Sequence, residues 1–201
     1  MTPTLQAKLI AAMAETIFVH AEELTELDRA IGDGDHGLNM ERGFRHVLEA
    51  SPQWHDKPSA ETLKALGTAL IMKVGGASGP LYGTLFMSLG KAWPEPLDAA
   101  GLAAALASAI AAIEKLGKSE PGQKTMLDVL VPVQEALARG GEGLSARLAR
   151  CAAEAAERTV PMRAIKGRAS FLGERSIGHM DPGARSASLL VAAICGALDT
   201  D

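Results

Sequence analysis

Apolar residues recur every three or four positions along most of this chain, which is the spacing of one face of an amphipathic helix. The first such segment runs from about Leu5 to Leu27, with leucine, isoleucine and methionine along one face. No stretch alternates β-branched and polar residues at every second position, so we predict no β-sheet. Further helices are expected at about 38–50, 59–74, 79–93, 98–116, 125–139, 144–159 and 184–198.

Eight helices with short connections should pack antiparallel, so we predict an all-α, eight-helix up-and-down barrel or bundle, with residues 1–201 forming a single domain. The connections that follow the first, third, fifth and seventh helices then lie at one end. Those four connections are unusually rich in glycine and charge, whereas the others are ordinary turns. They span residues 32–37, 75–79, 117–124 and 167–183. The alternation predicts one functional site at one end of the barrel.

Composition narrows the function classes. Aromatic residues make up only 3% of the chain, which suits a core of close-packed helices better than a sheet. The net charge is -4 and no long basic run exists, which argues against nucleic-acid binding and against an anionic membrane surface. Cys151 and Cys195 are expected to be small buried thiols of a reduced, cytoplasmic protein. We see no signal peptide, and the apolar run Ala99–Ile113 is expected to be too short to span a bilayer.

The most informative connection holds three carboxylates within eight residues, Asp28, Asp33 and Asp35. Clustered acids repel one another unless a cation lies among them. An EF-hand is excluded because Gly37 and Phe44 stand where it needs oxygen ligands, and zinc is disfavoured because no cysteine or second histidine lies at ligand spacing. Oxygen ligands alone favour Mg²⁺ or Ca²⁺. A solvated acidic turn that caps the next helix is the alternative.

Two glycine-containing connections precede helices. Residues 75–80 read Gly-Gly-Ala-Ser-Gly-Pro, and exposed backbone N–H groups at a helix N-terminus favour phosphate. A glycine that ends one helix before a tight turn is the alternative. Gly117-Lys-Ser lacks the first glycine and the preceding strand of a P-loop. Lys124 and Thr125 could present an ammonium and a hydroxyl to the site, although Thr125 as a helix cap is favoured.

The last connection, 167–183, is long for a helical bundle, which is typical of functional loops. Arg168 and Arg175 are candidates for phosphate contact or partner docking. A Ser/His/Asp hydrolase, with Ser170 or Ser176 beside His179 and Asp181, lacks an elbow motif and is disfavoured.

Four motifs in these connections together resemble the nucleotide-binding L subunit of bacterial dihydroxyacetone kinases, a domain that also forms the C-terminal half of ATP-dependent dihydroxyacetone kinases. The single departure noticed is Gly34, where alanine is more usual. The motifs are Leu-Asp-Arg-Ala-Ile-Gly-Asp-Gly-Asp-His-Gly-Leu-Asn-Met from residue 27, Gly-Gly-Ala-Ser-Gly-Pro-Leu-Tyr-Gly from 75, Lys-Thr-Met-Leu-Asp from 124, and Gly-Arg-Ala-Ser-Phe-Leu-Gly-Glu-Arg-Ser from 167.

The resemblance implies an eight-helix barrel that binds ADP or ATP at one end. It implies that Asp28, Asp33 and Asp35 hold two Mg²⁺ ions against the nucleotide phosphates. From the residues themselves, none looks like a nucleophile for a phospho-enzyme, so no catalytic residue is expected. The nucleotide contacts that the resemblance implies are His36, Asn39, Ala77, Ser78, Gly117, Met126, Arg168, Asp181, Pro182 and Gly183.

The resemblance also implies a cytoplasmic phosphotransferase that is active only with partner chains. A K subunit would carry dihydroxyacetone, and a phosphohistidine M subunit would rephosphorylate the bound ADP; a homodimer is left open. Two alternatives remain. One is a subunit of an ATP-dependent ketose or tetrulose kinase with exchangeable ATP, and the other is a nucleotide-dependent regulatory binding module.

Overall fold

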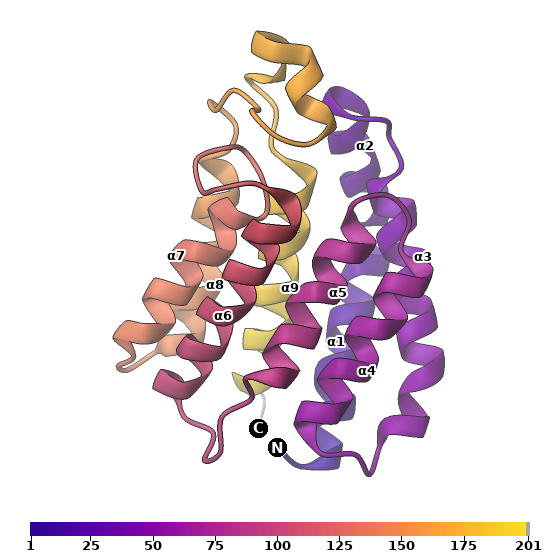
Figure 1. The fold of residues 1–201 in the computed structure, drawn as a ribbon, viewed down its shortest axis with the longest axis vertical. Helices are drawn as coiled ribbons and strands as arrows, with labels where there is room; N and C mark the ends of the chain where they lie inside the picture. Colours follow the sequence, from indigo (N-terminus) through magenta and orange to yellow (C-terminus); the bar gives the residue numbers. More distant parts are fainter. Residues whose placement is uncertain (200–201) are drawn as a thin grey trace.

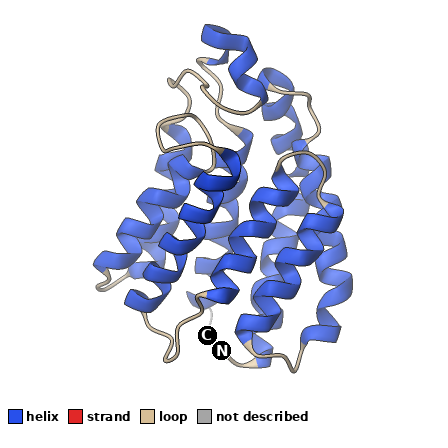
Figure 2. Ribbon diagram, in the orientation of Figure 1, coloured by secondary structure: helices blue, strands red, loops and turns tan. Residues whose placement is uncertain are grey.

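The computed structural model describes residues 1–199, and every regular element in that part is a helix (Figure 2), which confirms the all-α prediction. The α-helices are α1 (Pro3–Val19), α2 (Ala21–Ile31), α3 (His36–Ala50), α4 (Ser59–Lys73), α5 (Ser78–Lys91), α6 (Ala99–Gly117), α7 (Leu127–Arg139), α8 (Leu144–Glu157) and α9 (Pro182–Asp199), with short 3₁₀ helices η1 (Ser51–Trp54) and η2 (Arg168–Ser176).

Eight of the α-helices close into a ring (Figure 1). α1 packs on α3, each helix from α3 to α8 packs on the next in the chain, and α9 returns to α1. The N-terminus and the C-terminal end of α9 lie at one end of this ring, and η2 lies at the other (Figure 1). The predicted eight-helix barrel is therefore confirmed.

The first helix differs from the prediction of one continuous helix over 5–27, which is wrong. α1 ends at Val19, His20 has non-helical angles with φ of -102° and ψ of 9°, and α2 begins at Ala21. Glu23 in the first turn of α2 is held by the Arg185 Nε of α9 at 2.6 Å. A contact between such distant segments leaves no trace in the apolar spacing, which continues through the bend.

α2 approaches the start of α3 very closely, and Gly37 permits it. A Cβ atom at this position would lie 1.9 Å from the carbonyl oxygen of Ala21 and 2.4 Å from the Oγ1 of Thr25. Any side chain here would push the two helices apart. This close packing places Asp28, in the last turn of α2, beside the N-terminus of α3.

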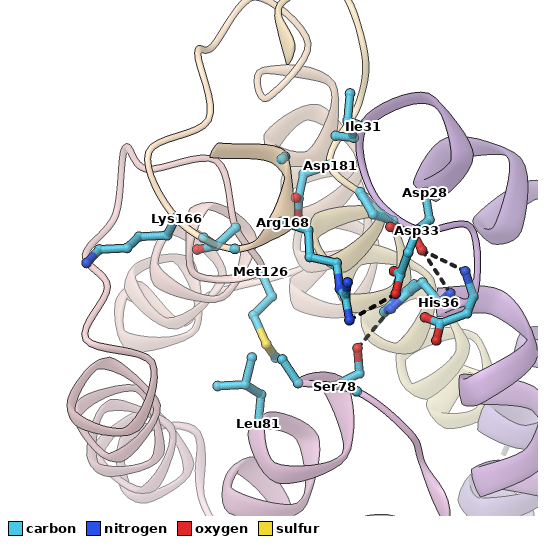
Figure 3. A pocket seen from close by; sticks show the side chains of 18 of the residues that line it. Asp28, Ile31, Asp33, His36, Ser78, Leu81, Met126, Lys166, Arg168 and Asp181 are labelled. Atoms are coloured by element: carbon cyan, nitrogen blue, oxygen red, sulfur yellow. Dashed lines mark hydrogen bonds and ion pairs between the residues drawn. The ribbon is translucent and has the colours of Figure 1, made fainter. Parts of the chain in front are cut away.

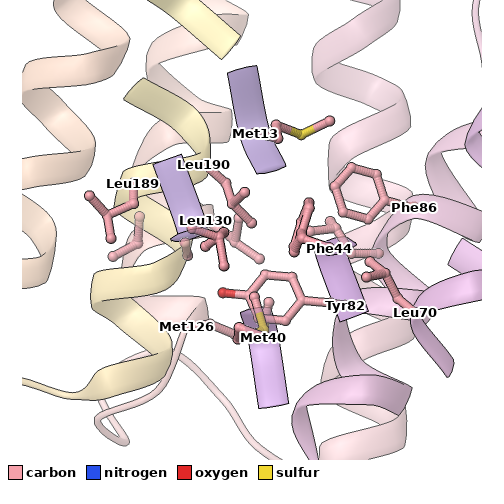
Figure 4. Close-up of a cluster of buried hydrophobic side chains, with 14 of the residues drawn as sticks. Met13, Met40, Phe44, Leu70, Tyr82, Phe86, Met126, Leu130, Leu189 and Leu190 are labelled. Carbon is pink, nitrogen blue, oxygen red and sulfur yellow. The ribbon is translucent and has the colours of Figure 1, made fainter. Parts of the chain in front are cut away.

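The core inside the ring is built from aliphatic and methionine side chains with few aromatics, as the composition suggested (Figure 4). Met13, Met40 and Phe44 are buried there, and Tyr82 is the largest side chain with almost no exposed surface. Methionine fills irregular gaps where rigid rings do not fit. Both cysteines are free thiols, Cys195 buried and Cys151 half-buried.

α6 includes the apolar run that was expected to be too short to span a bilayer. The whole helix has 19 residues, and an 18-residue window within it has a mean hydropathy of 1.6, so by length and composition alone it could cross a membrane. In the ring it packs between α5 and α7. In this position 28% of that window is buried, so packing in the ring covers part of its apolar surface.

Two further boundaries and one additional element differ from expectation. Ser59 is the first residue of α4 rather than its cap, and α9 begins at Pro182 rather than Ala184. The connection 167–183 contains η2, which the pattern did not indicate. A small cluster of Ile31, Ala164, Ala169 and Leu172 packs η2 against α2.

Candidate functional site

A pocket opens at the end of the ring that carries η2 (Figure 3). All four unusual connections contribute to its lining, so the prediction that they meet at one end is confirmed. From the third connection only its last residue, Lys124, lines the pocket, followed by Thr125 and Met126. The lining residues that the sequence proposed are Asp28, Asp33, Asp35, His36, Ala77, Ser78, Met126, Arg168, Asp181, Pro182 and Gly183.

Four helices begin at this pocket. His36, Ser78 and Pro182 are the first residues of α3, α5 and α9, and Met126 directly precedes α7. The first N–H groups of a helix have no partner within the helix, and its dipole places partial positive charge there. Four such N-termini around one pocket favour an anionic ligand.

The three aspartates come together, with one oxygen from each within 4.8 Å of the others. Asp28 is buried, and its Oδ2 accepts the backbone N–H groups of Asp35 at 2.8 Å and His36 at 3.1 Å. These bonds fix one carboxylate while Asp33 and Asp35 stay exposed. A cluster of three carboxylates open to the pocket fits a hard divalent cation.

Arg168 supplies positive charge beside this cluster. Its Nη2 lies 3.0 Å from the Oδ2 of Asp33, and both side chains are partly exposed (Figure 3). Arg168 is the first residue of η2, so the packing of η2 on α2 places it at the mouth of the pocket.

Gly34 sets the turn between two of the aspartates. Its φ is +75°, a left-handed conformation that costs any residue with a Cβ more than glycine. A Cβ would also lie 2.5 Å from the Cγ of Arg29. The one noticed departure from the family pattern is therefore a glycine at a position whose backbone suits glycine.

His36 stands behind the aspartates in a buried hydrogen-bonded chain. Its Nδ1 lies 2.9 Å from the Oγ of Ser78, and its Nε2 lies 2.9 Å from the Oγ of Ser186. Burial lowers the pKa of His36 to about 4, although the charges of Asp28 and Asp35 oppose that shift. The imidazole is therefore neutral at physiological pH.

Asp181 caps α9 from the floor of the pocket. Its Oδ2 accepts the backbone N–H of Ala184 at 2.7 Å. Burial raises the pKa of Asp181 to about 7, because the cap bond only partly offsets the lost hydration of the charged form.

Lys124 does not present its ammonium to a ligand, so the less favoured alternative of the sequence analysis finds no support. The Nζ donates to the backbone carbonyls of Met162 at 3.0 Å, Ser176 at 2.7 Å and His179 at 2.6 Å. Burial lowers the pKa of this lysine. The favoured helix start is confirmed, but the N-cap residue of α7 is Met126 rather than Thr125, whose Oγ1 accepts the N–H of Leu127 at 3.2 Å.

Two of the residues implied by the resemblance do not line the pocket. The buried Asn39 lies beneath the glycine turn, where its Oδ1 accepts from Arg42 Nη2 at 2.8 Å. A Cβ on Gly75 would lie 2.5 Å from that Oδ1. Gly117 ends α6.

The hydrolase alternative finds no support in the described contacts. The hydroxyl of Ser176 donates to the Gly173 carbonyl at 2.6 Å and accepts the N–H of Ala164 at 2.9 Å. Ser170 donates to the Gly167 carbonyl at 2.6 Å. Both hydroxyls therefore brace the loop itself.

Sequence reasoning missed five lining residues: Ile31, Leu81, Tyr82, Lys166 and Ala169. Leu81 and Tyr82 follow Ser78 by three and four positions, so helical spacing places all three on one face of α5. That spacing from Ser78 could have identified Leu81 and Tyr82 as lining residues. Tyr82 is buried, and its hydroxyl lies 2.7 Å from the Oγ of Ser186.

The chain matches known proteins over nearly its whole length. Residues 30–196 match the model of the DAK2 domain. The chain is 48% identical over 179 residues to the ADP-binding subunit DhaL of the PEP-dependent dihydroxyacetone kinase of Escherichia coli K12, covering 85% of each chain. It is 45% identical over 177 residues to the corresponding subunit of kinase 1 of Listeria innocua, covering 88% of this chain and 87% of that one.

Longer kinases contain a similar domain. The chain is 39% identical to part of the L-erythrulose 1-kinase of Mycolicibacterium smegmatis, spanning 86% of this chain and 32% of that protein. Its fold also matches a crystal structure of the dihydroxyacetone kinase from C. freundii in complex with AMP-PNP and Mg²⁺, with a TM-score of 0.77 and 24% identity over 96% of this chain and 34% of that one. The chain therefore belongs to the DAK2-domain family and is similar over most of its length to the ADP-binding subunits of dihydroxyacetone kinases.

Proposed function

We propose that this chain is the nucleotide-carrying subunit of a PEP-dependent dihydroxyacetone kinase. The observation that carries the proposal is one pocket that combines three clustered carboxylates with the N-termini of four helices. The identities of 45% and 48% to subunits of that name support it. The whole chain would act as one nucleotide-binding domain in the cytoplasm, where free thiols such as Cys151 and Cys195 persist.

The roles of the acidic and basic side chains follow from their charges. Asp28, Asp33 and Asp35 would hold two Mg²⁺ ions, and the ions would bind the phosphates of ADP or ATP. Arg168 would give up all or part of its ion pair with Asp33 and would neutralise charge on the phosphoryl group, as arginine does in other phosphoryl-transfer sites. The N-termini of α5 and α9 would contribute backbone donors.

The apolar part of the pocket would hold the base. Leu81 of α5 and Met126, just before α7, line the pocket, and the small residues Ala77 and Gly183 line it as well. Asn39 and Gly117, which lie outside the lining, would act on the nucleotide only by supporting these segments.

When bound, the Mg-nucleotide supplies phosphoryl transfer by cycling between ADP and ATP. The chain's own groups bind, orient and neutralise, and we assign no catalytic nucleophile. Phosphoryl transfer needs in-line positioning and charge stabilisation rather than a covalent protein intermediate. The ketose would be held by a separate K subunit, and a phosphohistidine M subunit would donate the phosphoryl group. Self-association into a homodimer is part of the same proposal, and light scattering tests it.

Reconstitution tests the proposal. The purified chain alone should phosphorylate no ketose, and activity should appear only with the K and M partners and a PEP-driven phosphocarrier supply. ADP should stay bound through many turnovers. Activity of the isolated chain with free ATP would contradict the proposal.

The erythrulose kinase similarity supports a second candidate, an ATP-dependent ketose or tetrulose kinase whose ketose-binding part is a separate chain. In that case the nucleotide must exchange in each cycle. An ADP dissociation rate faster than turnover, measured by displacement of a fluorescent analogue, would favour this candidate. A purely regulatory binding module would instead keep sugar phosphorylation intact when Asp33 is replaced by asparagine.

A further inference from the structure

The helix that carries Asp28 is not one of the eight that form the ring. α2 lies at the pocket end, beside η2 (Figure 1), where it packs on α3, α9 and η2. Each helix of the ring is held between two neighbouring helices, whereas α2 depends on separate contacts near its two ends. Those contacts therefore decide where the carboxylate of Asp28 lies relative to the rest of the pocket.

The C-terminal half of α2 is tied to α3 and to η2. The Oδ2 of Asp28 accepts two backbone N–H groups at the start of α3, and Ile31 packs in the small apolar cluster with η2. α3 in turn reaches α9, because the Nε2 of His36 lies 2.9 Å from the Oγ of Ser186. The direct link between α2 and α9 lies at the other end of α2.

The first turn of α2 supplies that link. Arg185 of α9 binds the carboxylate of Glu23 through two nitrogens, with Nε 2.6 Å from Oε1 and Nη2 3.3 Å from Oε2. The Nδ1 of His20 lies 2.6 Å from the same Oε2, so the carboxylate has a second partner. A planar guanidinium that meets a carboxylate through two nitrogens fixes direction as well as distance. The pair therefore sets the position of α2 against α9 more narrowly than a single contact would.

Neither side chain of this pair lines the pocket, but each belongs to an element that does. Glu23 precedes Asp28 by five residues on α2. The backbone N–H of Arg185 donates to the carbonyl of Asp181 at 2.9 Å in the first turn of α9. The pair thus joins the helix that carries a proposed metal ligand to a helix N-terminus that would bind phosphate.

Stability alone gives this pair little importance, whereas position gives it much. The side chains of Arg185 and Glu23 are 25% and 40% exposed, and ion pairs open to solvent contribute little to folding. Mg²⁺ needs near-ideal octahedral geometry with oxygen ligands about 2.1 Å away. A small displacement of α2 from α9 would therefore prevent one ion from binding a carboxylate and a phosphate together.

Resting on the proposed function, we propose that Glu23 and Arg185 are positioning residues that hold α2 against α9, so that Mg²⁺ on the acidic cluster also reaches the nucleotide phosphates. Neither residue touches the ligand. The pair matters only to a ligand that needs both helices, which is the Mg-nucleotide. ADP without metal needs the helix N-termini but not the acidic cluster, so its binding is insensitive to the pair.

Titration calorimetry with Mg²⁺ and in EDTA tests the pair. Glu23→Ala and Arg185→Ala should each weaken Mg-ADP binding by about tenfold, the scale of losing a group that supports a metal ligand, while ADP binding in EDTA changes by less than about twofold. The double variant should bind Mg-ADP no more weakly than Arg185→Ala, because all three variants lose the same contact. Arg185→Lys, which keeps a cation, should recover part of the affinity.

Glu22→Ala is the matched control, since it removes an exposed carboxylate from the same first turn of α2 and leaves the pair intact. It should change neither affinity. Unchanged Mg-ADP binding in Arg185→Ala, equal losses with and without Mg²⁺, or additive losses in the double variant would each overturn the proposal. If Glu23→Ala does not fold, Arg185→Ala and Arg185→Lys carry the test.

The proposed function and the positioning role can fail separately. If the unsubstituted chain binds no Mg-ADP, the proposed function fails, and hydrogen exchange over residues 21–31 still tests the link. Exchange that is faster in Arg185→Ala than in Glu22→Ala supports the link, and equal exchange overturns it. If the unsubstituted chain and Arg185→Ala bind Mg-ADP equally tightly, only the positioning role fails.

Discussion

At the scale of single residues, burial and charge divide the acids of the pocket into two kinds. Asp33 and Asp35 are exposed at the mouth, where a cation can reach them, whereas Asp181 is buried and caps a helix. Asp28 combines both properties, since it is buried and yet belongs to the acidic cluster. The metal-binding proposal therefore concerns the first three positions and predicts a different behaviour for Asp181.

Replacement of Asp33 by asparagine should weaken Mg-dependent ADP binding by at least the roughly 10- to 100-fold that follows loss of a group supporting a metal ligand. The amide cannot neutralise the ion, and Arg168 loses its carboxylate partner. Isothermal titration with Mg-ADP measures the effect. Asp98→Asn is the matched control, because Asp98 caps α6 at the other end and asparagine caps equally well. Equal affinity of the two variants would contradict the assignment.

The raised pKa of Asp181 predicts a pH dependence with a definite sign. Its pKa is about 7 in the folded chain against 3.8 ordinarily, so the folded state holds this proton more tightly than the unfolded state. The stabilisation is present below the ordinary pKa and is lost as pH rises toward 7. Asp181→Asn keeps the cap without titrating.

The free energy of unfolding of Asp181→Asn, minus that of the unsubstituted protein, should therefore increase from pH 4 to 7 and then level off. Urea denaturation in a chelating buffer, which removes bound metal, measures this difference. A difference that stays constant or decreases over the same range would show that burial does not raise the pKa of Asp181.

At the scale of elements, the fourth connection is held over the pocket by one ammonium. Lys124 binds three carbonyls of residues that lie between α8 and α9, and η2 packs on α2 through a small apolar cluster. Arg168 depends on both anchors, since it opens η2. The lysine therefore acts on the site through the loop that it holds.

Lys124→Met should lower the free energy of unfolding by about 3 kcal/mol, because the carbonyls lose a charged donor and remain buried. Hydrogen exchange should increase mainly over residues 160–180, together with a weaker affinity for Mg-ADP. Lys118→Gly is a suitable control, since Lys118 also has a positive φ and is exposed. Uniform protection in Lys124→Met would contradict the anchoring role.

At the level of elements, the sequence predicted the features that depend on local patterns and missed those that depend on distant contacts. The helices, the barrel and the three aspartates follow from local spacing, because apolar period and clustered acids are visible within a few residues. The Glu23–Arg185 contact beyond the bend at His20 joins residues 162 positions apart, and the Tyr82–Ser186 contact joins residues 104 positions apart. Such contacts exist only once the ring has closed, so no local pattern reveals them.

The role of Lys124 has the same origin. A lysine beside a helix start reads as a phosphate ligand, and only the position of the distant carbonyls shows that its charge is already used. Asn39 is a similar case, since its place beneath Gly75 is set by the packing of α3 on the turn after α4.

At the scale of the whole molecule, the pocket end also carries the most exposed large apolar side chain. Phe171 on η2 is 92% exposed, while its neighbours Ala169 and Leu172 pack on α2. The proposed function requires a ketose-carrying chain to approach this end. An exposed aromatic side chain on a braced loop is a typical anchor for such a contact.

Phe171→Ser should weaken association with the ketose-binding subunit by roughly tenfold or more while leaving Mg-ADP affinity unchanged. Surface plasmon resonance with the immobilised partner measures the first, and titration measures the second. Leu97→Ser, at the opposite end and 46% exposed, is the control. If both variants bind the partner as the unsubstituted chain does, the partner docks elsewhere.

The central claim is that the acidic cluster holds a nucleotide as a resident coenzyme, and the nucleotide content of the purified protein tests it most directly. Gel filtration in Mg²⁺, followed by denaturation and mass spectrometry of the released small molecules, should yield close to one ADP per chain. A chelator, or Asp33→Asn, should remove it. Protein that is folded and repeatedly free of nucleotide in the presence of Mg²⁺ and added ADP would contradict the account.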